Sequence, residues 1–337
     1  MKKIHKSKFR WTVFILVIGV IISFFLSLST GIIAISPAEV VQTILHNGTA
    51  RQEMVLFDFR LPGIILALLI GAGLAVSGSI LQGVTQNELA DPGILGINTG
   101  AGLAVVLFLF FFQGDLEPTN TSSIFLLPIF AFIGALVAAG FIYLLAWKKG
   151  IDPIRLVLVG IGINAAFSAF LVIFQLKMDP QNFRQATVWL SGDIWNTNWM
   201  FVLSILPWII TLIPVTISKA KTLDVLTLGD EVAAGLGSKI EKERVTLLFL
   251  AVALAGASVA AGGAIAFLGL IVPHITRKII GPLHQYIIPI STLIGGLLLI
   301  IADMIAKNLL QPTQMPVGII VSILSAPYFI YLLMKTK

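Results

Sequence analysis

The sequence predicts an all-α integral membrane protein with about ten transmembrane helices in one bundle. Hydrophobic residues make up 57% of the 337 residues and charged residues only 11%, against roughly 25% charged residues in soluble domains. Long apolar segments recur along the whole chain, and most reach the ~20 residues that a helix needs to cross a bilayer. Neither a linker nor a soluble domain separates them, so residues 1–337 are expected to form a single transmembrane domain.

The ten expected spans follow one another at short intervals: residues 12–33, 61–83, 93–112, 124–147, 154–176, 199–217, 244–262, 264–276, 286–306 and 316–334. The eighth is short and contains Pro273, which fits a broken helix whose backbone is covered by neighbouring helices. Before the third span, Asp91 is the expected N-cap and Pro92 the first helical residue. Residues 177–198 carry aromatic side chains and form either a helix at the membrane interface or a plain loop.

Small side chains recur every four residues from Gly71 to Gly83 in the second span, which forms a ridge that another helix can approach closely. The seventh span repeats this pattern, and residues 69–78 match residues 254–263 at five of ten positions. Because the two spans run in opposite directions in the expected topology, an inverted repeat that relates spans 2–5 to spans 7–10 is one interpretation. Chance similarity between segments rich in Gly and Ala is the other. Inverted halves would favour a transporter.

The distribution of Lys and Arg predicts the orientation of the chain in the cytoplasmic (inner or plasma) membrane. With both termini in the cytoplasm, all but five of the 22 Lys and Arg residues lie on the cytoplasmic side, which agrees with the positive-inside rule. The net charge of +6 therefore reports topology and implies no nucleic-acid partner. The first apolar run, residues 12–33, is longer than the h-region of a signal peptide and suits a retained anchor better.

Residues 218–244, between the sixth and seventh spans, contain ten of the 38 charged residues of the chain. Four apolar residues in this segment recur at four-residue steps and would line one stripe of a short helix: Leu228, Val232, Leu236 and Ile240. Asp230 and Glu231 would face elsewhere. The segment is either an ordinary cytoplasmic loop or an amphipathic element on which a soluble partner docks.

Local signals predict where this short helix ends. Gly237 is the expected C-cap. Ser238 and Glu241 have the spacing of a capping box, which predicts that the next helix starts at once.

The sequence contains no catalytic motif. Its four His residues are scattered, and neither an HExxH nor a GxSxG pattern occurs. A Walker loop is also absent, so an ATP-driven process would need a nucleotide-binding subunit separate from this chain. Cysteine is absent as well, which removes thiolate metal ligands. We therefore expect no catalytic residue, no cofactor and no metal site in this chain.

Polar side chains inside the expected spans are few. Asp303 and Lys307 stand four residues apart and would neutralise each other on one helix face; a proton relay is the rarer interpretation. Asn164 and Ser168 lie one turn apart in the fifth span. They either form hydrogen bonds between helices or line a transport pathway.

Six sequence strings, taken in order, carry a resemblance to a known family: RLPG (60–63), QGVTQNELADPGILGINTGAG (82–102), LGDEVAAGLG (228–237), AFLGLIVPHITR (266–277), ADMIAK (302–307) and MPVGIIVSILSAPYFIYLL (315–333). Together they resemble the membrane subunits of ABC importers for iron-siderophores and cobalamin, over nearly the whole chain. The resemblance implies a ten-span permease that pairs with a second permease subunit, either identical or paralogous. It also implies two ABC ATPase subunits on the cytoplasmic face, which hydrolyse the ATP, and an extracytoplasmic substrate-binding protein.

The resemblance also assigns roles to residues. Coupling to the ATPase falls on Leu228, Gly229, Asp230, Glu231, Val232, Leu236 and Gly237. Docking of the binding protein falls on the external cations Arg60 and Lys307. Gly63 departs from the family, in which a second Arg is common at that position. The cytoplasmic gate falls on Asn87, Leu89, Pro153 and Ile154.

The expected function is inward transport of an iron(III)-siderophore complex by alternating access, powered by the separate ATPase. The same machine carrying cobalamin or haem is the nearest alternative. An ion-coupled secondary transporter is another, and its uptake would survive loss of the ATPase and collapse with the ion gradient. An enzyme acting on lipid or peptide in the bilayer would need a catalytic set that the sequence does not contain.

Overall fold

The computed structural model describes residues 2–31, 33, 35–112, 121–148, 150–195, 197–310, 313 and 315–335. Among these residues the regular secondary structure is helical, apart from one isolated bridge between Trp147 and Ile151. The predicted all-α fold class is therefore confirmed.

In chain order the elements are α1 (Lys2–Ser29), α2 (Pro37–Ile44), α3 (Ala50–Glu53), the π-helix η1 (Met54–Arg60), α4 (Leu61–Thr85), α5 (Ile97–Phe111), α6 (Thr121–Ala146), α7 (Pro153–Gln175), α8 (Pro180–Leu190), α9 (Trp199–Ser218), α10 (Ala220–Leu226), α11 (Asp230–Gly235), α12 (Ile240–Gly262), α13 (Leu268–Ile280), α14 (His284–Leu309) and α15 (Val317–Lys335). Each of the ten expected spans overlaps one of these helices: α1, α4, α5, α6, α7, α9, α12, α13, α14 and α15.

Seven helices of the described part of the chain are long and apolar enough to cross a membrane: α1, α4 with the turns before it, α6, α7, α9, α12 and α14. Helices α5 and α15 are apolar but shorter, and α13 has 13 residues. The chain is thus a multi-pass membrane protein, and the count of about ten spans stays a prediction.

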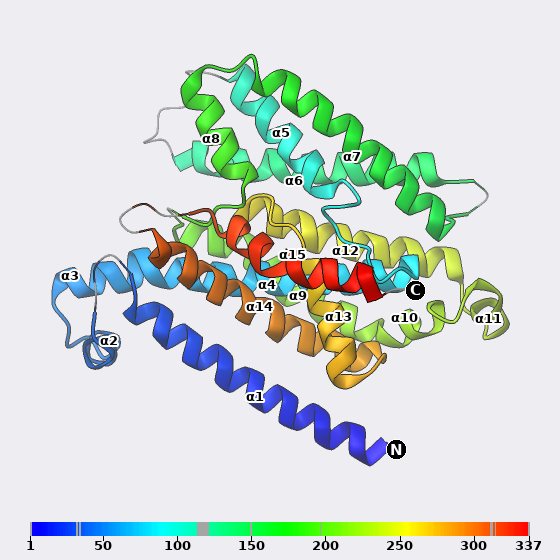
Figure 1. Ribbon diagram of the computed structural model, residues 1–337, viewed down its shortest axis with the longest axis horizontal. Coiled ribbons are helices and arrows are strands. Elements are labelled where there is room, and N and C mark those ends of the chain that lie inside the picture. Colours follow the sequence, from blue (N-terminus) through cyan, green and yellow to red (C-terminus); the bar gives the residue numbers. More distant parts are fainter. Residues whose placement is uncertain are drawn as a thin grey trace.

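Helix α4 lies at the centre of the bundle and packs against α9, α12, α13 and α14 (Figure 1). Glycines let it approach two of these helices backbone to backbone. A Cβ atom added to Gly71 would overlap the backbone of Gly295 in α14, and one added to Gly78 would overlap the carbonyl of Gly269 in α13. The ridge of small residues expected from the sequence is therefore a contact surface of the central helix.

Helices α5, α6 and α7 pack on one another and lie with α8 on one side of α12, while α1 lies against α14 on the other side (Figure 1). Both ends of the chain lie at the same end of the bundle as α10 and α11, and α2, α3 and α8 lie at the opposite end (Figure 1). Within residues 177–198, α8 forms a helix over Pro180–Leu190, and Asp179 caps its first turn. Its place at the membrane interface stays a prediction.

The helix of the third expected span starts later than the sequence predicts. Helix α5 begins at Ile97, after a left-handed Gly96, and residues 92–96 form turns. The prediction of Asp91 as a helix N-cap is therefore wrong. Its Oδ1 atom accepts a hydrogen bond from the N–H of Gly93 at 2.8 Å, which closes a turn instead of starting a helix.

The predicted capping box before α12 is also wrong, because α12 begins without a side-chain cap on Ser238. Glu241 instead accepts a hydrogen bond from the N–H of Ile151, at 3.3 Å, in the loop between α6 and α7. The C-terminal signal is confirmed: Gly237 follows α11 in the left-handed conformation with φ +78°. The N–H of Ser238 then donates to the carbonyl of Ala233 at 3.1 Å.

Candidate coupling surface, gate and outer cavity

Three large apolar side chains are exposed on the polar segment between α9 and α12. Leu228, Val232 and Leu236 expose 59%, 50% and 64% of their surface, and α11 lies at one end of the bundle (Figure 1). We call these three residues the apolar patch. Ile240, the fourth member of the expected stripe, is half-buried and packs against the core. Exposed apolar residues rimmed by charged ones are typical of protein contact surfaces.

The polar segment is tied to the bundle rather than free. In α10, Asp224 Oδ1 accepts a hydrogen bond from the backbone N–H of His284 at 2.8 Å and lies 2.7 Å from the ring Nδ1 of the same residue. In α11, Asp230 forms an ion pair with Arg244 of α12 at 2.6 Å. Both short helices are therefore anchored to long helices of the bundle.

The other expected coupling residues lie around α11. Gly229 precedes it with φ +96°, a conformation that favours glycine. Glu231 is exposed in its first turn. The predicted coupling residues therefore belong to one continuous segment that carries the apolar patch.

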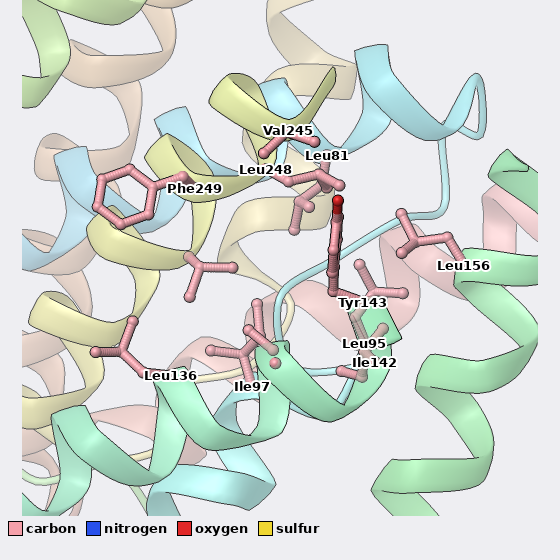
Figure 2. A pocket seen from close by; sticks show the side chains of 13 residues that line it. Leu81, Leu95, Ile97, Leu136, Ile142, Tyr143, Leu156, Val245, Leu248 and Phe249 are labelled. Atoms are coloured by element: carbon pink, nitrogen blue, oxygen red, sulfur yellow. The ribbon is translucent and has the colours of Figure 1, made fainter. Parts of the chain in front are cut away.

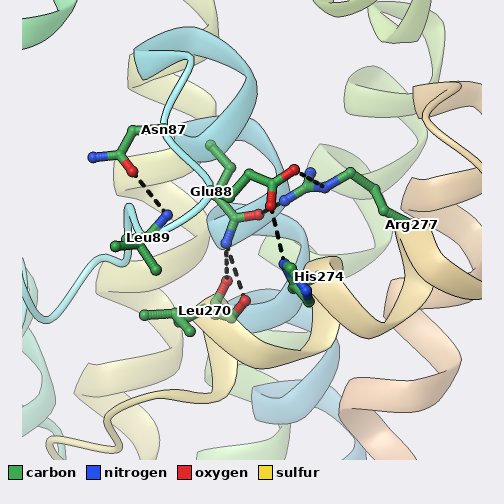
Figure 3. A network of polar contacts seen from close by, with 8 residues as sticks. Asn87, Glu88, Leu89, Leu270, His274 and Arg277 are labelled. Atoms are coloured by element: carbon green, nitrogen blue, oxygen red, sulfur yellow. Dashed lines mark hydrogen bonds and ion pairs between the residues drawn. The ribbon is translucent and has the colours of Figure 1, made fainter. Parts of the chain in front are cut away.

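The turn after α4 is anchored to α13 by a polar network (Figure 3). Asn87 Oδ1 accepts a hydrogen bond from the N–H of Leu89 at 2.9 Å, and both side chains are half-buried. Glu88, between them, lies 3.2 Å from Nδ1 of His274 and 3.8 Å from Nε of Arg277. The two expected gate residues of this turn are thus held in place by the residue between them.

Asp91 lies at the end of the same turn, and its carboxyl group is buried. No cationic side chain is among the groups that shift its pKa. Burial raises the pKa of Asp91 to about 6, and hydrogen bonds from the backbone of Gly93, Ile94 and Leu270 offset part of this effect. Its ordinary pKa is 3.8. Above pH 6 Asp91 is therefore ionised in both states, and its negative charge costs more free energy in the folded protein than in the unfolded chain.

We expect the thermal stability of the protein to rise when the pH falls from 7 to 5, through protonation of Asp91. The folded state takes up this proton near pH 6 and the unfolded state only near pH 4, so stability falls as the pH rises between these values. The gain amounts to about 1 kcal/mol. Unfolding of the detergent-solubilised protein at pH 7 and pH 5 measures it. Asp91→Asn is the control and should lack this part of the pH dependence; equal pH dependence in both proteins would contradict the assignment.

The second pair of expected gate residues lies in the first turn of α7. Asp152 caps this helix and Pro153 occupies its first position. Ile154 is 72% exposed. Further along, α7 touches the segment that follows α4, because a Cβ atom added to Gly160 would come within 2.9 Å of the side chain of Leu95. The turn after α4 and the start of α7 are the two expected gate elements. The segment after that turn contacts α7 at Gly160, which lies further along the helix than Pro153.

Of the two polar residues in the fifth expected span, Asn164 joins helices. The hydroxyl of Thr99 in α5 donates a hydrogen bond to Asn164 Oδ1 in α7. Ser168 is exposed on α7 and stays a candidate for a pathway lining.

The two external cations lie together at the end of the bundle opposite to α11. Arg60 and Lys307 both line a cavity of about 190 Å³. The guanidinium of Arg60 donates to the backbone carbonyls of Leu28 and Ile33. Lys307 forms the expected ion pair with Asp303 at 2.6 Å. Both cations are therefore held in place by their own chain.

Gly63 leaves room for Lys307. A Cβ atom added to Gly63 would lie 3.3 Å from Nζ of Lys307. A longer cationic side chain at this position would compete with Lys307 for the same space, so the positive charge of this cavity comes from Arg60 of η1 and Lys307 of α14.

An apolar cavity of about 260 Å³ lies between α4, α5, α6, α7 and α12 (Figure 2). Leu156 of α7 faces Val245 and Leu248 of α12 across it, and the hydroxyl of Tyr143 is the one polar group among its lining side chains. Among the described residues, no group of three or more His, Asp and Glu side chains is placed to hold a metal ion.

Comparison with known proteins gives the family. The model of the FecCD transport family matches residues 19–335. The chain belongs to the FecCD transport family. The iron(3+)-hydroxamate import system permease protein FhuG of Bacillus subtilis (strain 168) is 57% identical over 318 residues, which are 94% of this chain and 95% of FhuG. The hemin transport system permease protein HmuU of Yersinia pestis is 37% identical over 296 residues, 87% of each chain.

A solved structure shares the fold. An inward-facing metal-chelate type ABC transporter aligns with a TM-score of 0.82 at 28% identity and covers 96% of this chain and 98% of its own. The resemblance read from six sequence strings is thereby confirmed.

Sequence reasoning missed the charged residues that anchor the gate turn and the coupling segment: Glu88, His274, Arg277, Asp224, His284 and Arg244. Several of them stand next to an apolar segment, where a charge is easily taken for a solvated terminus, and Asp224 lies inside the polar segment. The signal was the position of Arg244, which is the fifth residue of α12 and is followed at once by an apolar run. A charge at that depth needs a partner.

Proposed function

We propose that this chain is the membrane-spanning permease subunit of a binding-protein-dependent ABC importer that carries iron(III)-siderophore complexes into the cell. The observation that carries the proposal is 57% identity, over almost the whole of both chains, with a permease of iron(3+)-hydroxamate import. Siderophores with hydroxamate ligands are therefore the first substrates to test. Cobalamin and haem are the alternatives, and a hemin permease at 37% identity makes haem a necessary arm of the test.

The cytoplasmic partner is an ABC ATPase, and the surface that supports this assignment is the apolar patch. Three exposed apolar side chains on an anchored polar segment provide a contact that is stable only when a partner covers them. In this arrangement two ATPase subunits dock on two permease subunits, which are identical or paralogous. Both termini of the chain then lie in the cytoplasm, since they share the end of the bundle that carries α11 (Figure 1).

The extracytoplasmic partner is a substrate-binding protein that presents acidic side chains to Arg60 and Lys307. These cations share one cavity at the end of the bundle opposite to α11. Because each is already bonded to its own chain, docking adds partners to cations held in a fixed position. Exposed ion pairs of this kind add ~0–1 kcal/mol each and contribute more to orientation and association rate than to affinity.

Uptake of radioactive iron tests the proposal. A strain that lacks its own hydroxamate permease, and expresses this chain with its binding protein and ATPase, should accumulate iron from ferric hydroxamates. Ferric citrate, a ferric catecholate and haem, each labelled with radioactive iron, and cobalamin labelled with radioactive cobalt form the comparison panel. Uptake should vanish when the ATPase is inactivated by mutation. Accumulation of haem or cobalamin alone would give the substrate to the alternative, and uptake that survives ATPase inactivation but collapses with the ion gradient would indicate a secondary transporter.

A further inference from the structure

Arg244 is a charged side chain buried at the start of α12, with 2% of its side chain exposed. Acceptors that meet its nitrogens offset the cost of burying a guanidinium, and here both terminal nitrogens have an acceptor while Nε is buried without one. One terminal nitrogen, Nη2, forms the ion pair with Asp230 of α11 at 2.6 Å. The other, Nη1, donates to the backbone carbonyl of Ile151 at 2.6 Å. The two arms of one planar group therefore join α11 to the loop between α6 and α7.

Glu241, on the same helix, completes the attachment of this loop. The N–H of Ile151 donates to Glu241 Oε2 at 3.3 Å, so α12 holds this residue at both its N–H and its carbonyl. Gly150 lies close by with φ +130°, and a Cβ atom there would come within 3.2 Å of the same carboxylate. The loop is short and closed by the bridge between Trp147 and Ile151. Ile151 is therefore held against α12 at both of its backbone groups.

This loop leads directly into α7. Asp152, the next residue after Ile151, is the N-cap of α7. Helix α7 packs on α5 and α6, whereas α12 packs on α4, α6 and α9. Between Leu156 of α7 and Val245 of α12 lies the apolar cavity of about 260 Å³, which leaves α7 room to move (Figure 2). The polar attachment at Ile151 is therefore a direct link between α11 and the first turn of α7.

We propose that Arg244 is a positioning residue that transmits displacement of α11 to the cytoplasmic end of α7, through Asp230 on one side and Ile151 on the other. The proposal rests on the proposed function, in which the ATPase displaces α11. Arg244 itself is buried and does not touch the ATPase. Its role differs from that of a passive anchor, because an anchor would hold the loop without passing on a response to ATP.

The absence of cysteine from the chain allows a single reporter thiol. Lys148→Cys places it on an exposed position of the loop before α7, outside the apolar span. The rate of labelling by a water-soluble maleimide is measured on the complex with its ATPase, with and without trapped ATP, and the ratio of the two rates reports movement of this loop and the start of α7. In the otherwise unchanged protein we expect this ratio to change by about fivefold or more. A ratio of one in that protein would overturn the proposal.

Asp230→Ala removes the link between α11 and Arg244 and leaves the contact between Arg244 and Ile151. We expect the ATPase to stay bound, the labelling ratio to fall to about one, and uptake to drop about tenfold. Asp230→Glu restores a carboxylate and should recover both readouts. Thr246→Ala is the matched control, since the hydroxyl of Thr246 donates to the carbonyl of Lys242 in its own helix. A normal ratio in Asp230→Ala would overturn the proposal.

Arg244→Gln decides the case in which Asp230→Ala releases the ATPase. Its side chain is 2% exposed, so this substitution replaces no side chain of the apolar patch. A bound ATPase with a ratio of one supports the link, and a normal ratio overturns it. A separate variant, Leu236→Asp, tests the proposed function. If this variant retains the ATPase, the apolar patch is not needed for ATPase binding and the proposed function fails, whatever the labelling ratio shows.

Discussion

Replacement of Leu236 by Asp is expected to release the ATPase from this chain while the chain stays inserted in the membrane. Leu236 exposes 64% of its surface and forms the apolar patch with Leu228 and Val232. Covering a leucine side chain contributes about 1.5–3 kcal/mol, and a carboxylate in the same contact must be desolvated without a designed partner. We therefore expect co-purification of the ATPase to fall at least about 30-fold, which corresponds to the 2 kcal/mol of a hot-spot residue.

Detergent pull-down of the ATPase measures this effect, with iron uptake as the second readout. Leu176→Asp is the matched control, because Leu176 is also an exposed leucine but follows α7 at the opposite end from Pro153. It should retain the ATPase. Equal retention by both variants would show that the apolar patch is not the docking surface.

Replacement of Gly78 by Ala is expected to destabilise the bundle more than replacement of any other glycine of α4 by Ala. The added Cβ would overlap the carbonyl of Gly269 in α13. Because the obstacle is backbone and not the end of a flexible side chain, α4 and α13 must move apart. Overpacking of this kind costs about 1–3 kcal/mol or more, and the loss of neighbouring helix contacts adds to it. We expect a lower unfolding temperature in detergent and a reduced monodisperse peak in size-exclusion chromatography.

Gly140→Ala provides the control for the Gly78 variant. Gly140 lies inside α6, and no atom lies within 4 Å of a Cβ atom added there. Alanine is the better helix former by about 1 kcal/mol, so this variant should be neutral or more stable. Equal unfolding temperatures for the two variants would contradict this prediction, because they would show that α4 and α13 can move apart at Gly78 without loss of stability.

Much of the fold could be predicted because hydrophobicity is a local property of the chain. A segment of about 20 apolar residues must become a helix in hydrocarbon, whatever its neighbours are. Each of the ten expected segments overlaps a helix for this reason. Asp303 and Lys307 pair as expected, since residues four apart meet on any helix. The apolar patch was also readable, because its spacing stands out within a polar segment.

The two capping errors have different causes. Asp91 accepts the hydrogen bond that an N-cap would accept, from the N–H of Gly93, but residues 92–96 form turns and the helix starts later. Glu241 stands at a capping position and accepts from a distant backbone N–H instead. Glu241 bonds to Ile151, which is 90 residues away in the chain. Capping bonds contribute only about 1 kcal/mol, so a tertiary contact of similar strength is enough to replace them. Nothing within a few residues of Glu241 could reveal that competitor.

The sequence by itself determined that this is a helical membrane protein of one transporter family, which segments become helices, and which polar segment carries exposed apolar side chains at regular spacing. Only the tertiary structure decided that Arg244 joins α11 to the loop before α7, that Arg60 and Lys307 share one cavity, and that Gly78 meets Gly269 backbone to backbone. The physical reason is range. Partition into the bilayer depends on composition along the chain, whereas a buried guanidinium, a shared cavity or a close helix crossing depends on which distant residues arrive beside it.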